Sequence, residues 1–245
     1  MTISAKDRII FALDVPGVDE ASGYVRLLRG HVGVFKVGLE LFVSTGPAII
    51  KAVRDAGAEK IFLDMKFHDI PETVKRAMAS AGALNADFVT VHCEGRGLLK
   101  AVSEASAAGM KVLGVTVLTS LDLEDMRDAG IDPRYQTPEA LVLQRALIAK
   151  ESGCAGVVCS GLEAKAVRAL VGPDFLIVTP GIRSESDAVH DQKRATTAYQ
   201  AIRNGADYIV VGRPIRRASD PVKAAEAIAG EIERGVEDRT DRTLS

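Results

Sequence analysis

The chain has 245 residues, enough for a large hydrophobic core and close to the usual size of one α/β barrel. Its 31 Lys and Arg residues are balanced by 33 Asp and Glu residues, so no overall positive field indicates binding to nucleic acid or to an anionic membrane. The N-terminus lacks a signal-peptide core, and no apolar run is long enough to span a bilayer. We therefore expect one soluble, cytoplasmic domain over residues 1–245.

Short apolar segments alternate along the chain with segments of helical periodicity, eight of each. In chain order, the sequence predicts strands at residues 8–15, 34–38, from residue 61, and at 87–92, 111–120, 155–160, 175–183 and 208–213. It predicts helices at residues 18–29, 46–56, 72–84 and 97–108, a long helix ending near 151, and helices at 162–170, about 195–204 and 220–234. The charged residues 236–245 are expected to form a frayed C-terminal tail.

The apolar segments lack polar alternation, which is typical of strands buried on both faces. Several helix-to-strand joints reuse small residues, as in Asn-Ala-Asp at 85–87 and Asn-Gly-Ala-Asp at 204–207. This recurring unit predicts a parallel (β/α)8 TIM barrel. An open, doubly wound sheet is the alternative, but it more often has a glycine-rich phosphate loop after its first strand. This chain has Asp14-Val15-Pro16-Gly17 there.

The three cysteines, Cys93, Cys154 and Cys159, lack the spacing of zinc ligands and are predicted to be small core residues. His92 is the one neighbouring base for a catalytic thiol at Cys93. Adjacent residues on a strand face opposite sides, however, which disfavours that pairing.

Three charged residues, Asp64, Lys66 and Asp69, stand at the end of the third predicted strand. Because alternate residues of a strand share a face, Asp64 and Lys66 should lie side by side. Pro71 ends the strand, which places Asp69 in the loop before the next helix. The alternatives to a catalytic role are an ordinary Asp64–Lys66 ion pair and an N-cap at Asp69 with Glu72 as its partner. Inward charges on a buried strand are costly unless paired, which favours a function for the set.

Other polar residues follow other predicted strands, and in a parallel barrel all these strand ends meet at the rim that carries the active site. The candidates at this rim are Asp14, Lys36, Asp64, Lys66, Thr119, Arg183 and Arg213. Gly181-Ile182-Arg183 and Gly212-Arg213 follow the seventh and eighth strands, where such barrels commonly bind phosphate. We therefore expect a phosphorylated substrate. The polar loop 181–195, which contains Gln192, either folds over this ligand or is an idle surface loop.

The alternation of Lys36, Asp64, Lys66 and Asp69 favours decarboxylation or proton transfer at carbon. The repulsion between fixed carboxylates and a neighbouring substrate anion falls when that anion loses its charge, and an ammonium group can donate a proton. Magnesium binding by Asp64 and Asp69 is the competing use, although the interleaved lysines argue against it. A Schiff base at Lys66 or Lys36 is a further alternative.

The segment Asp64-Met65-Lys66-Phe67-His68-Asp69-Ile70-Pro71-Glu72-Thr73 resembles the signature of the orotidine 5′-monophosphate decarboxylase family, which catalyses the last step of UMP synthesis. Segments along nearly the whole chain are similar to the bacterial branch, at residues 11–14, 35–38, 115–120, 178–183, 191–192 and 211–214. The resemblance implies a TIM barrel that works as a homodimer with shared active sites. It also implies release of CO2 from orotidine 5′-monophosphate to form UMP, without a metal or an organic cofactor.

By the same resemblance, Lys66 protonates C6 of the pyrimidine after CO2 leaves. Asp64 presses electrostatically on the substrate carboxylate and holds Lys66. Asp69 comes from the other subunit and completes the charged array with Lys36, while Thr73, also from that subunit, meets the ribose. The remaining residues implied to bind substrate are Asp14 and Lys36 at the ribose, Thr119 (with Ser120 as the less favoured choice) at the pyrimidine edge, Arg183, Gln192, Gly212 and Arg213 at the phosphate, and Ile70 and Pro180.

Two other functions remain as alternatives. A magnesium-dependent sugar-phosphate decarboxylase or aldolase of the same barrel group shares the Asp-x-Lys-x-x-Asp motif, but Lys36 and the extension over residues 69–73 favour the nucleotide enzyme. The other alternative is a catalytically inactive nucleotide-binding barrel that acts as a regulatory module, which the intact set of charged residues disfavours.

Overall fold

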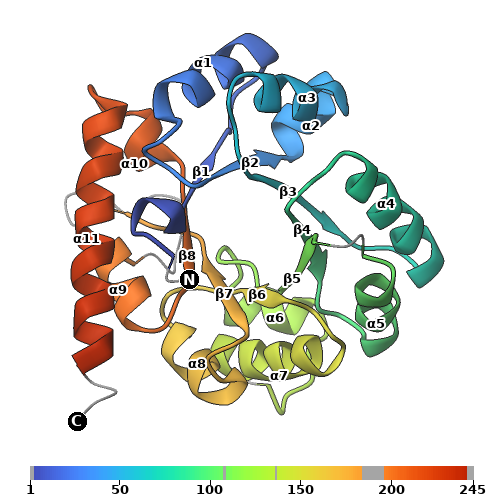
Figure 1. Ribbon diagram of the computed structural model, residues 1–245. Helices are drawn as coiled ribbons and strands as arrows, with labels where there is room; N and C mark the ends of the chain where they lie inside the picture. The colour runs from blue at the N-terminus through green and yellow to red at the C-terminus, as the bar shows by residue number, and fades with distance from the viewer. Residues whose placement is uncertain (1–2, 107–108, 136, 184–195, 242–245) are drawn as a thin grey trace.

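The computed structural model describes residues 3–106, 109–135, 137–183 and 196–241. Eight parallel strands close into a barrel in chain order, with helices around the outside (Figure 1). The strands are β1 (Ile9–Ala12), β2 (Val34–Gly38), β3 (Ile61–Phe67), β4 (Phe88–His92), β5 (Lys111–Val115), β6 (Gly156–Val158), β7 (Leu176–Thr179) and β8 (Tyr208–Val211). The predicted TIM barrel is confirmed.

The helices that cover the barrel follow the predicted order. They are α1 (Val18–Leu28), α3 (Ala48–Asp55), α4 (Pro71–Ala83), α5 (Arg96–Glu104), α7 (Pro138–Glu151), α8 (Ala164–Val171), α9 (Ala198–Arg203) and α11 (Pro221–Asp241), with the short 3-10 helix η1 (Lys6–Arg8) before β1. No helix in the described ranges is both long and apolar enough to cross a membrane.

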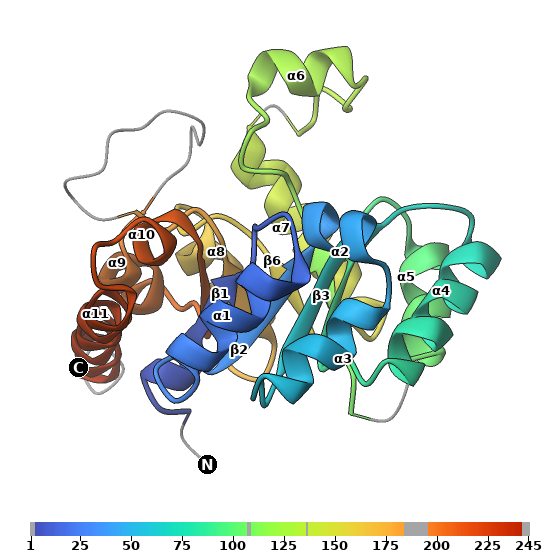
Figure 2. The same cartoon turned by 90° about the horizontal axis from the view of Figure 1, so that it is seen from above.

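Three short α-helices in the described ranges were not predicted, and neither was η1: they are α2 (Leu39–Thr45), α6 (Leu123–Asp128) and α10 (Arg213–Arg216). They are too short to show a clear helical period in the sequence. The start of α6 does carry a local signal, because Asp122 and Asp125 form a capping box. β5 ends at Val115, not at residue 120, and the chain then turns into α6, which projects away from the barrel (Figure 2).

The expectation of a frayed tail over residues 236–245 is wrong for residues 236–241. α11 continues past the predicted end at residue 234 as far as Asp241, and residues 242–245 lie outside the described part of the chain. α11 runs alongside α9 (Figure 1). Val236 packs against the hydrophobic core, and the Arg239 guanidinium donates to the Ala206 carbonyl at 3.3 Å. These contacts are tertiary, so local charge composition did not indicate them.

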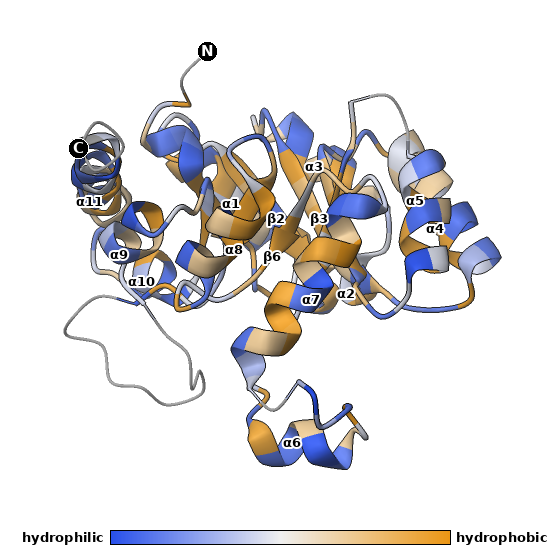
Figure 3. Cartoon of the chain, turned by 90° about the horizontal axis from the view of Figure 1, so that it is seen from below, coloured by the Kyte–Doolittle hydropathy of each residue, from blue (hydrophilic) through white to orange (hydrophobic). Residues whose placement is uncertain are grey.

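Apolar side chains pack on both sides of the strand ring, as expected for strands buried on both faces. The hydropathy colouring of Figure 3 shows strands that are largely hydrophobic. A large cluster lies between the strands and the helices. A smaller cluster fills the barrel interior and consists of Ile10, Val34, Phe62, Phe88, Leu113, Val178 and Tyr208. This interior cluster closes the barrel below the ends of the strands, so a ligand can enter only at a rim.

A buried ion pair connects the N-terminal ends of β7 and β8. Asp207, just before β8, accepts a hydrogen bond from the amide of Ile177 on β7 at 2.9 Å and pairs with Arg168 of α8 at 2.5 Å. Arg168 also donates to the carbonyls of Gly205 and Phe175. One carboxylate thus joins two strands and a helix.

The same arrangement occurs between β3 and β4. Asp87 accepts from the amide of Ile61 at 2.8 Å and pairs with Arg54 of α3 at 2.6 Å. Both aspartates end the small-residue joints noted in the sequence, and this shared role explains why the joints recur. The Asp207 side chain is 13% exposed and the Asp87 side chain 34%, so the second pair lies closer to solvent.

Replacing Asp207 with alanine should lower the free energy of unfolding by about 3–5 kcal/mol, because it leaves a buried guanidinium without its charge partner. Asp87→Ala should cost less, because its pair is more exposed. Urea unfolding at neutral pH measures both. Asp55→Ala is the matched control, since Asp55 makes an exposed pair with Lys51 and should change stability by no more than about 0.5 kcal/mol. Equal losses for Asp207→Ala and Asp55→Ala would contradict this role.

Candidate active site

The end of β3 departs from regular strand geometry where its charged residues lie. Between β3 and β4 the register steps from Leu63 opposite Val89 to Phe67 opposite Val91, so β3 carries extra residues in a bulge. Lys66, within this bulge, has a backbone φ of 49°, a left-handed conformation that non-glycine residues rarely adopt. Such strain concentrates at functional sites, and here it belongs to the predicted proton donor.

Four side chains from three neighbouring strand ends form an alternating row, which we call the charged array: Asp14, Lys36, Asp64 and Lys66. The Lys66 ammonium lies 2.9 Å from each carboxylate oxygen of Asp64. The Lys36 ammonium lies 3.5 Å from Asp64 Oδ2 and 3.3 Å from Asp14 Oδ1. Lys36 therefore bridges two carboxylates, and Asp64 is held between two ammonium groups. The side-by-side placement predicted for Asp64 and Lys66 is confirmed.

Burial makes the array electrostatically strong. The Lys36 and Asp64 side chains are 10% and 12% exposed, so their charges are poorly screened by water. Burial by itself would raise the pKa of Asp64, but the charges of Lys36 and Lys66 and the hydrogen bonds from Lys66 and Thr90 outweigh it and hold that pKa below its usual value of 3.8. Asp64 is thus a carboxylate at neutral pH.

The charged array faces a cavity of about 330 Å³ at the C-terminal rim. Of the predicted site residues, the cavity lining includes Asp14, Lys36, Asp64, Lys66, Pro180, Arg183, Gly212 and Arg213. Arg183, Arg213 and Arg216, which we call the arginine cluster, follow β7 and β8. One cavity therefore combines the charged array with cations and glycine backbone suited to an anionic group.

Two polar residues of this site were not predicted. Arg216 lines the cavity, and its guanidinium donates to the backbone carbonyl of Asp14. Its signal was the i, i+3 spacing from Arg213, which places both side chains on one face of a helical turn. Thr90 is fully buried on β4 and bonds to Asp64. A threonine within the apolar run 88–92 was a weaker signal, because buried threonines are common in strands.

Other predicted residues lie away from this cavity in the described part of the chain: Asp69, Ile70, Thr73 and Thr119. Thr119 is half-buried in the turn after β5. Asp69 is exposed and accepts a hydrogen bond from the adjacent amide of Ile70. Ile70, not Asp69, is the N-cap residue of α4, so the capping-box alternative is wrong. Gln192 and most of the loop 181–195 lie outside the described residues.

Among the described residues, no group of three or more His, Cys, Asp or Glu side chains is arranged to hold a metal ion. The three cysteines are buried, as predicted for core residues. Burial raises the pKa of the Cys93 thiol, which keeps this group protonated and weakly nucleophilic.

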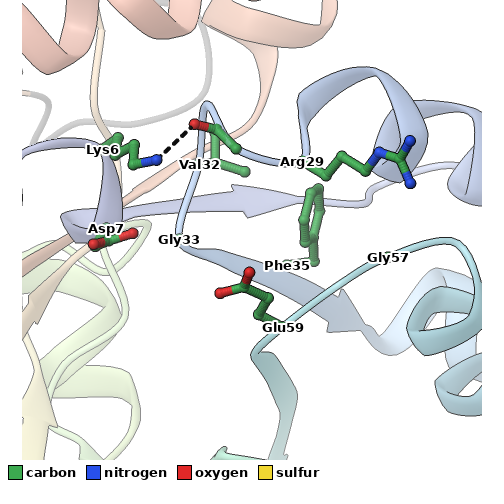
Figure 4. Close-up of a pocket in the computed structure, with 9 residues that line it drawn as sticks. Lys6, Asp7, Arg29, Val32, Gly33, Phe35, Gly57 and Glu59 are labelled. Carbon is green, nitrogen blue, oxygen red and sulfur yellow. Dashed lines mark hydrogen bonds between the residues drawn. The ribbon is translucent and has the colours of Figure 1, made fainter.

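Another cavity, of about 270 Å³, lies at the opposite, N-terminal end of the strands (Figure 4). Lys6 and Asp7 line it from before β1, Gly33 from before β2, and Glu59 from before β3. The Lys6 ammonium already bonds to the Gly30 carbonyl at 3.1 Å. Because this end of a parallel barrel serves stability and the charged array lies at the other end, we place the candidate active site at the C-terminal rim.

Comparison with known proteins shows which family this chain resembles. The family model described as "Orotidine 5'-phosphate decarboxylase / HUMPS family" matches residues 7–228. An orotidine 5′-phosphate decarboxylase of Desulfosudis oleivorans is 53% identical over 236 residues, covering 94% of this chain and 95% of that protein. One of Trichlorobacter lovleyi is 45% identical over 240 residues, covering 95% and 98%. The crystal structure of the Lactobacillus acidophilus orotidine 5′-phosphate decarboxylase matches with a TM-score of 0.79 at 38% identity, covering 91% of this chain and 98% of that one.

Replacing Asp64 with asparagine should flatten the acid side of the pH–stability profile. A carboxyl whose pKa is lower in the folded than in the unfolded protein adds stability above its unfolded pKa, and this stability is lost as the pH falls through the folded value. The variant lacks this group, so its free energy of unfolding should fall less than that of the wild type as the pH drops below about 4. Urea unfolding at stepped pH measures the slope, and identical slopes would contradict the assigned electrostatics.

Proposed function

The chain belongs to the orotidine 5′-phosphate decarboxylase / HUMPS family, and on that basis we propose that it is a carboxy-lyase that converts orotidine 5′-monophosphate to UMP and CO2 in de novo pyrimidine biosynthesis. The observation that carries this proposal is the charged array beside the arginine cluster in one cavity. A nucleotide monophosphate has its phosphate at one end and its base at the other. The two groups of side chains match that distribution.

In the proposed reaction, the bond between C6 and the substrate carboxylate breaks, and its electron pair stays on C6 as CO2 leaves. The Lys66 ammonium then gives a proton to C6, which forms the new C–H bond, and solvent returns a proton to the neutral amine. The double contact with Asp64 at 2.9 Å supports this role, because it holds the ammonium in one place before the reaction. Fixed charge near the developing carbanion is an effective way to lower such a barrier.

Asp64 has two parts in this proposal. It orients Lys66, and as a buried carboxylate it disfavours a second negative charge beside it. A substrate carboxylate placed near Asp64 is therefore relieved of repulsion when it leaves as neutral CO2. The pKa of Asp64 lies below its usual value, although burial alone would raise it. Asp64 is therefore charged at neutral pH, and this supports the role because protonation would remove the repulsion.

We assign the arginine cluster to the 5′-phosphate, together with Gly212 and, outside the described residues, Gln192. Arginine forms charge-assisted hydrogen bonds with phosphate oxygens, and glycine lets the backbone approach them closely. Asp14 and Lys36 lie between the two ends of the cavity and are assigned to the ribose hydroxyls. Pro180 lines the cavity, and Thr119 is assigned to the pyrimidine edge on the strength of the family resemblance.

We further propose a cytoplasmic homodimer in which Asp69, Ile70 and Thr73 complete the site of the other subunit. Their exposure supports this, since Ile70 is an apolar residue that is 67% exposed directly beside the catalytic strand. The reaction as proposed uses neither a metal nor an organic cofactor, because Lys66 itself supplies the proton and the positive charge at C6.

The direct test is an absorbance assay of the purified protein with orotidine 5′-monophosphate, with and without EDTA. We expect substrate loss with one CO2 and one UMP formed per substrate, at a rate that EDTA does not change. Lys66→Ala should remove this turnover. Folded protein that fails to turn over the nucleotide would contradict the proposal, and turnover abolished by EDTA and restored by magnesium would contradict its metal-free form.

The shared site predicts complementation between two inactive variants. In a mixed dimer, an Asp69→Ala subunit supplies Lys66 and a Lys66→Ala subunit supplies Asp69, so one of the two sites is intact. Random subunit exchange should then restore up to about a quarter of wild-type activity, because half the dimers are mixed and half their sites work.

Mixing Lys66→Ala with Asp64→Ala is the matched control for that experiment. Both residues come from the same subunit in every site, so no mixed dimer has an intact site and no activity should return. Recovery in the control, or none in the first mixture despite demonstrated exchange, would contradict a shared site.

A further inference from the structure

Thr90 lies directly opposite the bulge that carries Asp64 and Lys66. On β4 it stands between Val89 and Val91, the two residues across which the β3 register slips. The bulge takes the Lys66 amide out of the regular ladder, and the Thr90 hydroxyl oxygen accepts a hydrogen bond from that amide at 2.8 Å. A side chain therefore supplies the acceptor that the neighbouring strand does not.

The same hydroxyl also acts as a donor. It donates its proton to Asp64 Oδ1 at 2.9 Å. The Thr90 hydroxyl therefore bonds both to the Asp64 carboxylate and to the backbone amide of Lys66, whose ammonium pairs with that carboxylate. A hydroxyl has one proton and two lone pairs, so it can do both at once. Thr90 is 0% exposed, which leaves no water to replace either hydrogen bond.

We propose that Thr90 is a positioning residue, which keeps Asp64 and Lys66 in their reactive arrangement without touching the substrate. The proposal rests on the proposed function for its effect on turnover. Thr90 faces the barrel interior, two residues beyond Phe88 of the interior cluster, and does not line the cavity. Its influence therefore passes through the two residues that do line it.

The strained backbone of Lys66 explains why such a residue is needed. With φ at 49°, Lys66 holds a conformation that its own preferences disfavour, so surrounding contacts must maintain it. The hydrogen bond to its amide is one such contact. Without it, the bulge is free to relax and carry the ammonium away from C6, and small displacements of reacting groups are costly to rate.

Two substitutions separate the hydroxyl from the bulk of the side chain. Thr90→Val keeps nearly the same shape but removes both hydrogen bonds, whereas Thr90→Ser keeps the hydroxyl. Thr116→Val is the matched control, because Thr116 is also 0% exposed and follows a neighbouring strand, but its hydroxyl donates to the Val158 carbonyl at 2.8 Å and not to a member of the charged array.

With orotidine 5′-monophosphate we expect Thr90→Val to lower kcat by about 10- to 100-fold, with KM changed by less than about threefold because the phosphate contacts remain. Thr90→Ser should stay within about threefold of the wild type in both parameters. Thr116→Val should keep wild-type kcat, even where its melting temperature falls as far as that of Thr90→Val. Unchanged kcat in Thr90→Val, or an equal loss in Thr116→Val, would overturn the proposal.

A second readout does not depend on turnover. Carboxyl carbon NMR, with the Asp64 signal assigned by comparison with Asp64→Asn, follows the ionisation of Asp64 against its charged neighbours Lys36 and Lys66. The midpoint should rise in Thr90→Val and stay at the wild-type value in Thr90→Ser and Thr116→Val. An unmoved midpoint in Thr90→Val would overturn the positioning role. Wild-type protein without turnover but with the expected midpoints would count against the proposed function alone.

Discussion

One buried carboxylate, Asp64, is the constraint on which the rest of the site depends. A carboxylate that is 12% exposed at the top of an apolar barrel is expensive to keep charged unless cations surround it. Lys36 and Lys66 supply those cations from either side, and Asp14 balances Lys36. The bulge in β3 gives the chain room to bring Lys66 back onto a residue only two positions away. The charged array is therefore stable as a set, and each of its members depends on the others.

The barrel divides stability and chemistry between its two ends. At the N-terminal end, Asp87 and Asp207 join neighbouring strands to helices and hold the strand register. Between the two ends, the interior cluster is fully apolar except for the Tyr208 hydroxyl and keeps water out of the barrel. At the C-terminal end, the charged array and the arginine cluster meet in one cavity although their residues lie as much as 202 positions apart in the chain. The contacts of Asp87 and Asp207 thus stabilise one end of the barrel, and the strained backbone of Lys66 lies at the other.

The features that follow from residue periodicity were predicted from the sequence. Strand alternation predicted Asp64 beside Lys66, a contact that the structure makes through the bulge, and the meeting of parallel strand ends predicted Lys36 and Arg213 near them. Features set by tertiary geometry were not predicted. The bulge that makes Thr90 an acceptor depends on register between two strands, and α11 extends to Asp241 because it packs on α9. Within one chain, Asp69 lies apart from the charged array and bonds to the Ile70 amide. Its proposed assignment to the site of a second subunit rests on the family resemblance and not on contacts within one barrel.

The most direct test of the assigned site is a crystal structure of the protein with bound UMP. We expect the phosphate against Arg183 and Arg213, and C6 of the pyrimidine within about 3.5 Å of the Lys66 ammonium, with Asp64 still bonded to that lysine. A nucleotide bound in this cavity with its pyrimidine turned away from Lys66, or bound at the N-terminal cavity lined by Lys6 and Glu59, would contradict it.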